Sequence, residues 1–121
     1  MSTDPSLPSR GEIWRVNFDP TIGAEIRKTR PAVVVSSDGV GKLPVKLIAP
    51  ITAWSPAFAG NLWHVRIEPS PENGLTKPSA VDTLQLRGAD VQRFEARLGQ
   101  VSPAVLDAIT AAVAAVIEFE A

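Results

Sequence analysis

The chain has 121 residues, of which 45% are apolar, which is enough for one globular domain with a modest core and too little for two. Its net charge is −1, and the 12 basic and 13 acidic residues are interspersed, which excludes a polybasic arm, an acidic tail and a broad basic surface. The absence of cysteine excludes disulfides and thiolate chemistry, and the single histidine, His64, excludes a two-histidine metal site or acid–base pair.

The N-terminus has no apolar stretch of the kind found in secretory signals. No apolar window in the chain approaches the roughly 20 residues that cross a bilayer. We therefore expect a cytoplasmic protein with no membrane partner. It should have a disordered tail over residues 1–9 and a single domain over residues 10–121.

Two β-strands are predicted near the start of the chain. Residues 11–18 alternate between apolar and polar side chains, so we expect one buried face, and Asp19-Pro20 ends this strand. Residues 32–37 begin with a continuous run of alanine and valine, which is typical of a strand covered on both faces. Residues 38–41 then predict a turn.

Three more strands are predicted in the middle of the chain. Residues 45–51 alternate, with one apolar face formed by Val45, Leu47, Ala49 and Ile51. Residues 62–68 alternate too, and they place His64 on the polar face as an exposed or interface side chain. Residues 79–86 form the fifth strand. The loop at 53–60 separates two of these strands, and residues 90–94 predict one helical turn.

The C-terminus changes period and predicts a helix. Ser102 suits the N-cap position and Pro103 suits the first helical position. Apolar residues then recur at three- and four-residue spacing, at Leu106, Ile109, Val113, Val116 and Ile117. Short strands followed by one amphipathic helix predict a mainly β fold, a small SH3-like β-barrel with the helix packed on it.

The segment between the first two strands contains the only tight cluster of cations, Arg27, Lys28 and Arg30, just after the carboxylate of Glu25. Arg30 supplies planar paired donors that match a phosphate group. Thr52, at the end of the third strand, offers a hydroxyl that can donate to a phosphate oxygen. A fixed set of this kind can act through preorganised electrostatics.

Short motifs that occur in a consistent order connect these residues to a known family. They are Gly11-Glu12-Ile13-Trp14, Phe18-Asp19-Pro20-Thr21-x-Gly23-x-Glu25, Arg30-Pro31, Ile51-Thr52, Gly74-Leu75, Ser79 six residues before Gln85, and Arg97-Leu98-Gly99-x-Val101. The ordered set resembles the MazF/PemK family, the ribosome-independent mRNA-cleaving toxins of bacterial type II toxin–antitoxin pairs. It covers nearly the whole chain from Arg10.

The resemblance implies a homodimeric, sequence-specific endoribonuclease that cuts single-stranded RNA without a metal or other cofactor. Its products would be a 2′,3′-cyclic phosphate and a 5′-hydroxyl. An antitoxin with an acidic, disordered segment would restrain it, and contact with DNA would be only indirect, through that antitoxin. Arg30, Thr52 and Glu25 match the family's catalytic residues. Because an arginine stays protonated in proteins, we expect Arg30 to stabilise the transition state and to assist the leaving group. We expect the base to be Glu25, a water or a perturbed arginine.

The RNA-binding surface is expected to include the first loop, the aromatic loop and the end of the fifth strand. The two aromatics of the loop at 53–60, Trp54 and Phe58, can either stack on unpaired bases or pack on the barrel, and the sequence leaves both interpretations open. The predicted set is Pro20, Thr21, Arg27, Lys28, Trp54, Phe58, Gln85 and Arg87.

Two other functions are compatible with a small barrel. A toxin of the same fold that poisons DNA gyrase depends on C-terminal residues with a tryptophan, whereas this chain ends Ile117-Glu118-Phe119-Glu120-Ala121. A non-catalytic SH3-like module would bind a proline-rich or acidic peptide in an aromatic groove, but it leaves the set of Glu25, Arg30 and Thr52 unexplained.

Overall fold

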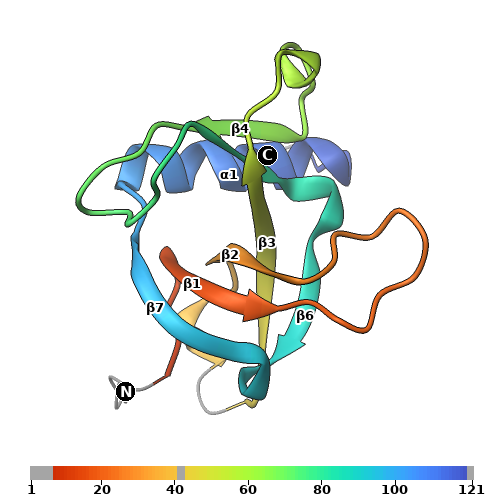
Figure 1. Cartoon of the computed structure of the whole chain (residues 1–121). Coiled ribbons are helices and arrows are strands. Elements are labelled where there is room, and N and C mark those ends of the chain that lie inside the picture. The colour runs from red at the N-terminus through yellow and green to blue at the C-terminus, as the bar shows by residue number, and fades with distance from the viewer. Residues whose placement is uncertain (1–6, 41–42, 120–121) are drawn as a thin grey trace.

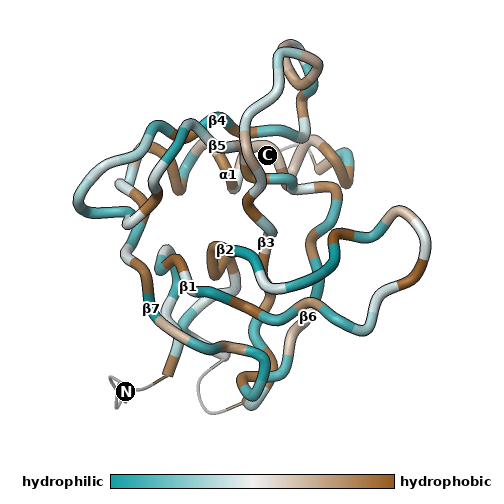
Figure 2. The backbone as a smooth tube through the Cα atoms, in the orientation of Figure 1, coloured by the Kyte–Doolittle hydropathy of each residue, from teal (hydrophilic) through white to brown (hydrophobic). Residues whose placement is uncertain are grey.

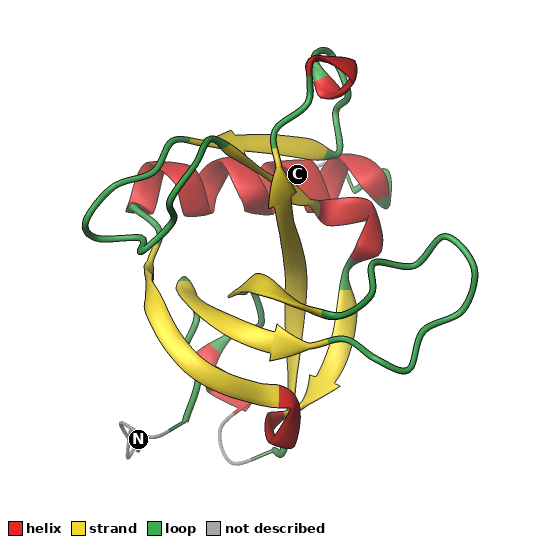
Figure 3. Cartoon of the chain, in the orientation of Figure 1, coloured by secondary structure: helices red, strands yellow, loops and turns green. Residues whose placement is uncertain are grey.

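The computed structural model describes residues 7–40 and 43–119 (Figure 1). Strands dominate it, and one longer helix follows them (Figure 3). In chain order the elements are β1 (Glu12–Asn17), β2 (Thr29–Val34), η1 (Asp38–Val40), β3 (Val45–Ala53), η2 (Pro56–Phe58), β4 (His64–Ile67), β5 (Ser79–Asp82), η3 (Thr83–Gln85), β6 (Arg87–Asp90), η4 (Val91–Arg93), β7 (Phe94–Gln100) and α1 (Pro103–Val116), where η marks a 3₁₀-helix. Among the described residues no helix has the length and apolarity that crossing a bilayer requires.

The strands form one antiparallel sheet in the order β4-β5-β3-β2-β1-β7, and β6 pairs with the first half of β3. β3 pairs with β6 at Val45–Ile48 and with β5 at Ile51–Ala53. The sheet curls around the core, with α1 lying along β4 (Figure 1). In the described part of the chain no pairing joins the end strands β4 and β7, so the barrel stays open there. The prediction of a mainly β, barrel-like fold with a C-terminal helix is confirmed.

Two cores lie on either side of the central strands, and brown stretches of the tube in Figure 2 mark apolar residues along these strands. The first core, to which α1 contributes, contains Ile13, Val33, Ala49, Ile51, Ile67, Val81, Val101 and Ile109. The second contains Val16, Phe18, Ala32, Val34, Ile48 and Ala89. Consecutive residues of β2 thus enter different cores, which confirms that this strand is covered on both faces.

The predicted apolar face of β3 is wrong for its first half. Val45 and Leu47 are exposed, whereas Lys46 and Ile48 are buried. The reason is that this half of β3 packs on the second core, which Ile48 enters.

The ends of the fifth strand and of the C-terminal helix also differ from the prediction. The fifth strand stops at Asp82, because the Asp82 carboxylate accepts a hydrogen bond from the backbone N–H of Leu84 and starts η3. The helical turn predicted at 90–94 is present as η4. Helix α1 begins as predicted, with the Ser102 hydroxyl accepting from Val105 N, but Ile117 lies beyond its end and is exposed.

Most of the predicted N-terminal tail, residues 1–6, lies outside the described residues. Ser9 belongs to the described part, and its backbone N–H donates to the Glu12 carboxylate at 2.7 Å. The backbone N–H of Glu12 donates back to Ser9 O at 3.0 Å. This pair of bonds attaches the start of the described chain to β1.

Candidate active site

The paired strands β2 and β3 separate where Arg30 and Thr52 lie. Pairing runs from Val34↔Ile48 to Ala32↔Pro50, and the same register continued by two residues sets Arg30 opposite Thr52. The β2 pairing is not continued to this position, and on its other edge Thr52 pairs with Ala80 of β5. Arg30 and Thr52 both line the resulting pocket, which has a volume of 320 Å³. The structure therefore brings these two predicted residues together.

Pro31 explains why the ladder stops here. Every second residue of β2 points its backbone N–H toward β3. Val35 N donates to Leu47 O at 2.9 Å, Val33 is the next position on this edge, and Pro31 is the one after it. A proline has no amide hydrogen, so the next ladder bond, toward Ile51, cannot form.

The walls of this pocket favour an anion. Its basic lining residues come from three different segments: Arg15, Arg30 and Lys77. Its hydroxyl-bearing lining residues are Thr29, Thr52, Thr76 and Ser79. Among the described residues no carboxylate lines it. A pocket that offers guanidinium, ammonium and hydroxyl donors, and no carboxylate to repel an anion, is suited to bind phosphate.

The Arg30 side chain is held by a backbone carbonyl three residues earlier in the chain. Its Nε donates to Arg27 O at 3.0 Å, and the side chain is half-buried. Within the described part of the chain, its two Nη groups have no hydrogen-bond partner. The fixed Nε bond orients the guanidinium while leaving its paired Nη donors for a ligand.

Glu25 lies outside this pocket. It lines a second hollow of 540 Å³ together with Gln85 and Arg87. Its carboxylate accepts from the backbone N–H of Ile22 at 2.5 Å, and the residue is exposed. The predicted catalytic set is thus divided between two pockets, with Arg30 and Thr52 in one and Glu25 in the other.

The loop that joins β1 to β2 carries Glu25 and is held by side chains from the η3–β6 segment. Gln85 Oε1 accepts from Ile26 N at 2.8 Å, and Gln85 Nε2 donates to Ala24 O at 3.1 Å. Arg87 Nη1 donates to Phe18 O at 3.2 Å. The sequence predicted Gln85 and Arg87 as RNA contacts, and their role in holding the loop was missed.

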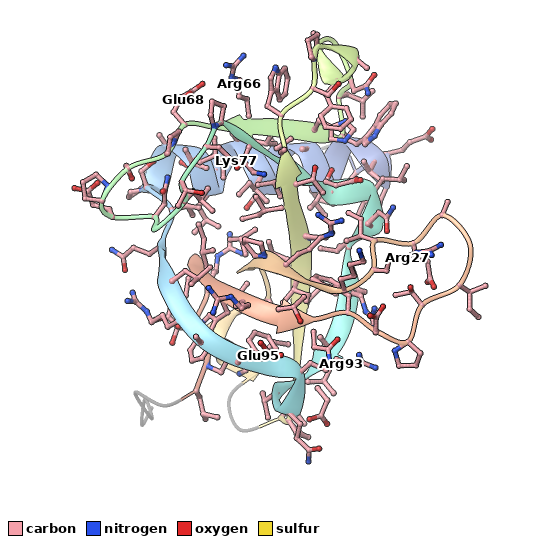
Figure 4. All side chains as sticks on the ribbon, in the orientation of Figure 1. Arg27, Arg66, Glu68, Lys77, Arg93 and Glu95 are labelled. Carbon is pink, nitrogen blue, oxygen red and sulfur yellow. The ribbon has the colours of Figure 1, made fainter. Side chains whose placement is uncertain are left out.

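The other predicted RNA-binding residues of this loop are mostly exposed. Pro20, Arg27 and Lys28 are exposed, and Thr21 is half-buried. Arg27 Nη2 donates to Gly23 O at 3.1 Å, and the backbone N–H of Lys28 donates to Asp19 Oδ1 at 3.0 Å. Figure 4 shows Arg27 on this loop, away from Lys77 on the loop between β4 and β5.

The aromatic loop packs on itself and on β4. The Trp54 and Phe58 rings meet edge-on, with centroids 5.9 Å apart, and Phe58 stacks on His64 at 3.9 Å. The Arg66 guanidinium lies 4.8 Å from the Trp54 ring centroid. His64 has only 7% of its side chain exposed, so the exposed alternative predicted for it is wrong. Stacking against Phe58 is the physical reason. The interface alternative stays a prediction.

Comparison with known proteins identifies the family. The model of the PemK-like, MazF-like toxins of type II toxin–antitoxin systems matches residues 9–117. The chain is 31% identical to endoribonuclease MazF9 of Mycobacterium tuberculosis over 104 residues, which cover 80% of this chain and 85% of that protein. It is 34% identical to endoribonuclease PemK of Escherichia coli over 92 residues, or 69% of this chain and 68% of that one.

A solved structure shows the same fold. It is an endoribonuclease from a mycobacterial species in complex with its cognate antitoxin, and it aligns with a TM-score of 0.75 at 19% identity, covering 95% of this chain and 99% of that one. The family model spans β1 to the end of α1, and both relatives align over more than two thirds of either chain. This chain therefore belongs to the PemK-like, MazF-like toxin family of type II toxin–antitoxin systems.

Proposed function

We propose that this chain, an endoribonuclease toxin of the MazF/PemK family, cuts single-stranded RNA in the pocket lined by Arg30 and Thr52. The observation that carries the proposal is the meeting of these two residues in a pocket with basic and hydroxyl groups and no lining carboxylate among the described residues. An RNA phosphodiester has the charge and the acceptor oxygens that such walls bind. The endoribonuclease names of the two relatives support the reaction class.

The chemistry uses the ribose as its own nucleophile. The 2′-oxygen attacks the neighbouring phosphorus, the bond from phosphorus to the 5′-oxygen breaks, and a 2′,3′-cyclic phosphate and a 5′-hydroxyl remain. Arg30 and Thr52 donate hydrogen bonds to the phosphate oxygens on which negative charge develops. The 2′-hydroxyl gives up its proton to a base, and the 5′-oxygen takes up a proton from water while Arg30 donates a hydrogen bond to it.

Glu25 is the proposed base. It lies on the β1–β2 loop and outside the Arg30 pocket, and the residue is exposed, so its side chain must turn toward the RNA when the substrate binds. Gln85 hydrogen bonds to Ala24 and Ile26, the two neighbours of Glu25, and thereby holds the backbone from which this side chain reaches the RNA.

The proposed reaction needs no metal. Three basic residues line the pocket, and a divalent cation placed among them would be repelled. The walls also lack the carboxylate and imidazole ligands that such cations prefer, among the residues described. The charge of the transition state is instead stabilised by the protein's own cations.

The partner of this toxin is an antitoxin. We further propose that an acidic, disordered antitoxin segment places its carboxylates where the RNA phosphates bind, so that antitoxin and RNA compete. The solved mycobacterial relative, which is bound to its cognate antitoxin, supports such a partner. A homodimer is also proposed, since large apolar side chains such as Leu62 at 60% and Leu84 at 61% are exposed.

One assay tests the reaction. Purified protein is incubated with a long single-stranded RNA in a chelator, the cleavage sites are mapped, and the product ends are analysed. We expect cleavage with cyclic phosphate and 5′-hydroxyl ends, and no cleavage of an oligonucleotide carrying a single 2′-deoxy residue at a mapped site. Cleavage of that oligonucleotide, or loss of activity in chelator, overturns the mechanism.

A further inference from the structure

Two cations of the pocket have no part in the chemistry described above. They are Arg15, on β1, and Lys77, on the loop between β4 and β5. We propose that Arg15 and Lys77 bind a second RNA phosphate, next to the one that is cut, and so fix the direction of the strand across the pocket. This inference rests on the proposed function, and it adds two substrate-binding residues that neither sequence motif nor family resemblance assigned.

The backbone beside Lys77 is fixed to β3, close to Thr52. The Ser79 hydroxyl, in a residue only 4% exposed, donates to Lys77 O at 2.8 Å. The backbone N–H of Trp54 donates to Pro78 O at 3.0 Å and continues the pairing of Thr52 with Ala80. Lys77 is therefore attached to the strand that carries the catalytic threonine.

The rest of this loop is built to stay in place. The buried Asn73 side chain donates to Glu68 O at 2.8 Å and accepts from Ser70 N at 2.9 Å and Leu75 N at 3.0 Å. Gly74 packs so tightly against β7 that an added Cβ would lie 2.2 Å from Leu98 O. A backbone already ordered in the free protein loses little entropy on binding, so mainly the Lys77 side chain has to be ordered.

Two carboxylates near these segments are paired with other cations. Glu12 on β1 accepts from Arg97 Nε at 2.7 Å, and Glu68 accepts from Arg66 Nε at 2.7 Å. Figure 4 shows Arg66 and Glu68 together at the edge of the molecule where Lys77 lies. Neither carboxylate lines the Arg30 pocket, so its positive charges are left for a ligand.

The charge balance points to more than one phosphate. A phosphodiester carries one negative charge, which Arg30 alone can match. The pocket adds two further cations, Arg15 and Lys77, from two further elements. An RNA strand carries a second negative charge on the phosphate of the next nucleotide, whereas a single small anion carries no second phosphate. The excess positive charge therefore fits a polyanionic strand.

The test measures RNA binding against salt. The probe is the mapped oligonucleotide with one 2′-deoxy residue, which binds without being cut, and its affinity is followed by fluorescence anisotropy over a series of salt concentrations. For a single strand, each phosphate contact contributes a slope of about 0.7 in log K against log salt. Lys77→Ala and Arg15→Ala should each flatten this slope by roughly that amount and weaken binding roughly tenfold at low salt.

Two variants serve as controls. Gln92→Glu changes the net charge by one unit, as Lys77→Ala does, but lies on η4 and outside the pocket. It should leave slope and affinity as in the wild type. Lys77→Arg keeps the charge and should keep the slope.

The outcomes separate the two proposals. A wild-type protein that cuts no RNA overturns the proposed function, whatever the Lys77 variants do. A wild type that binds and cuts RNA, together with unchanged slopes and affinities in Lys77→Ala and Arg15→Ala, overturns the second phosphate contact alone. An equal loss in Gln92→Glu also overturns it, because the effect would then come from net charge.

Discussion

The side-chain amide of Gln85 holds the backbone on both sides of Glu25. It accepts from Ile26 N at 2.8 Å and donates to Ala24 O at 3.1 Å. The two bonds fix the peptide groups that flank the carboxylate while the carboxylate itself stays exposed. The geometry of the proposed base therefore depends on a residue of η3 that need not contact the RNA.

Replacing Gln85 should reduce catalysis more than binding. Gln85→Ala removes both bonds and lets the loop sample other positions, so we expect single-turnover cleavage to fall about tenfold. The lost hydrogen bonds should also lower the free energy of unfolding by about 1 kcal/mol. Single-turnover kinetics and chemical denaturation measure the two effects. Gln92→Ala is the matched control, and an equal rate loss there would contradict the prediction.

Removing either of the two proposed hydrogen-bond donors to the phosphate should have a large effect on the rate of cleavage. A single preorganised donor is typically worth about 10²–10³ in rate, so Arg30→Ala and Thr52→Ala should each slow single-turnover cleavage by at least a factor of about 100. Arg30→Lys should also be slow, because a lysine cannot present paired planar donors.

Folding should survive these changes, since both residues are half-buried at the pocket rather than in a core. Thermal unfolding provides the check. Rates within tenfold of the wild type, with stability unchanged, would remove Arg30 and Thr52 from the proposed chemistry.

The two aromatics of the loop at 53–60 should behave differently. One face of the Phe58 ring stacks on His64, so Phe58→Ala should lower the melting temperature. Trp54→Ala should mainly weaken RNA and antitoxin binding, because stacking on a base is worth about 1–3 kcal/mol. Titration with RNA and with antitoxin, beside thermal unfolding, separates these effects. Unchanged affinity for both partners in a double variant would assign the two rings to packing alone.

Gly74 should tolerate no side chain. Its φ is +69°, and a Cβ would lie 2.2 Å from Leu98 O. Gly74→Ala should therefore lower the free energy of unfolding by roughly 3 kcal/mol or more. Gly23 provides the control, since its φ is +59° with nothing within 4 Å of an added Cβ. Gly23→Ala should cost only about 1–2 kcal/mol from backbone conformation. Equal losses in chemical denaturation would show that the close contact at Gly74 contributes nothing.

Strands were predicted where the sequence alternates and loops where it is broken, but β6 and β7 were missed. β6 contains Gly88 and two charged residues, and it forms because β3 offers a pairing edge. In β7, half-buried Phe94, Ala96 and Leu98 alternate with exposed residues, so a periodic signal was present and was not used.

The sequence predicted only part of the candidate site, because the rest of it depends on tertiary structure. Arg30 and Thr52 stand next to strand ends that the sequence marks clearly, and their meeting follows from the strand register. Arg15 reads as the solvent face of β1, and Lys77 as one residue of a loop. Only tertiary structure places them in the same pocket, so no local pattern indicates their proposed role.

Pro31 makes the opening of this pocket a property of the covalent chain. A mobile lid or a packed side chain can shift with temperature or with a bound partner, but an amide hydrogen that does not exist cannot be supplied by any such change. Stabilising the sheet elsewhere therefore cannot supply the missing ladder bond from Pro31 to Ile51, beside Arg30 and Thr52. We therefore expect that this protein can gain rigidity in its cores without closing the pocket between β2 and β3.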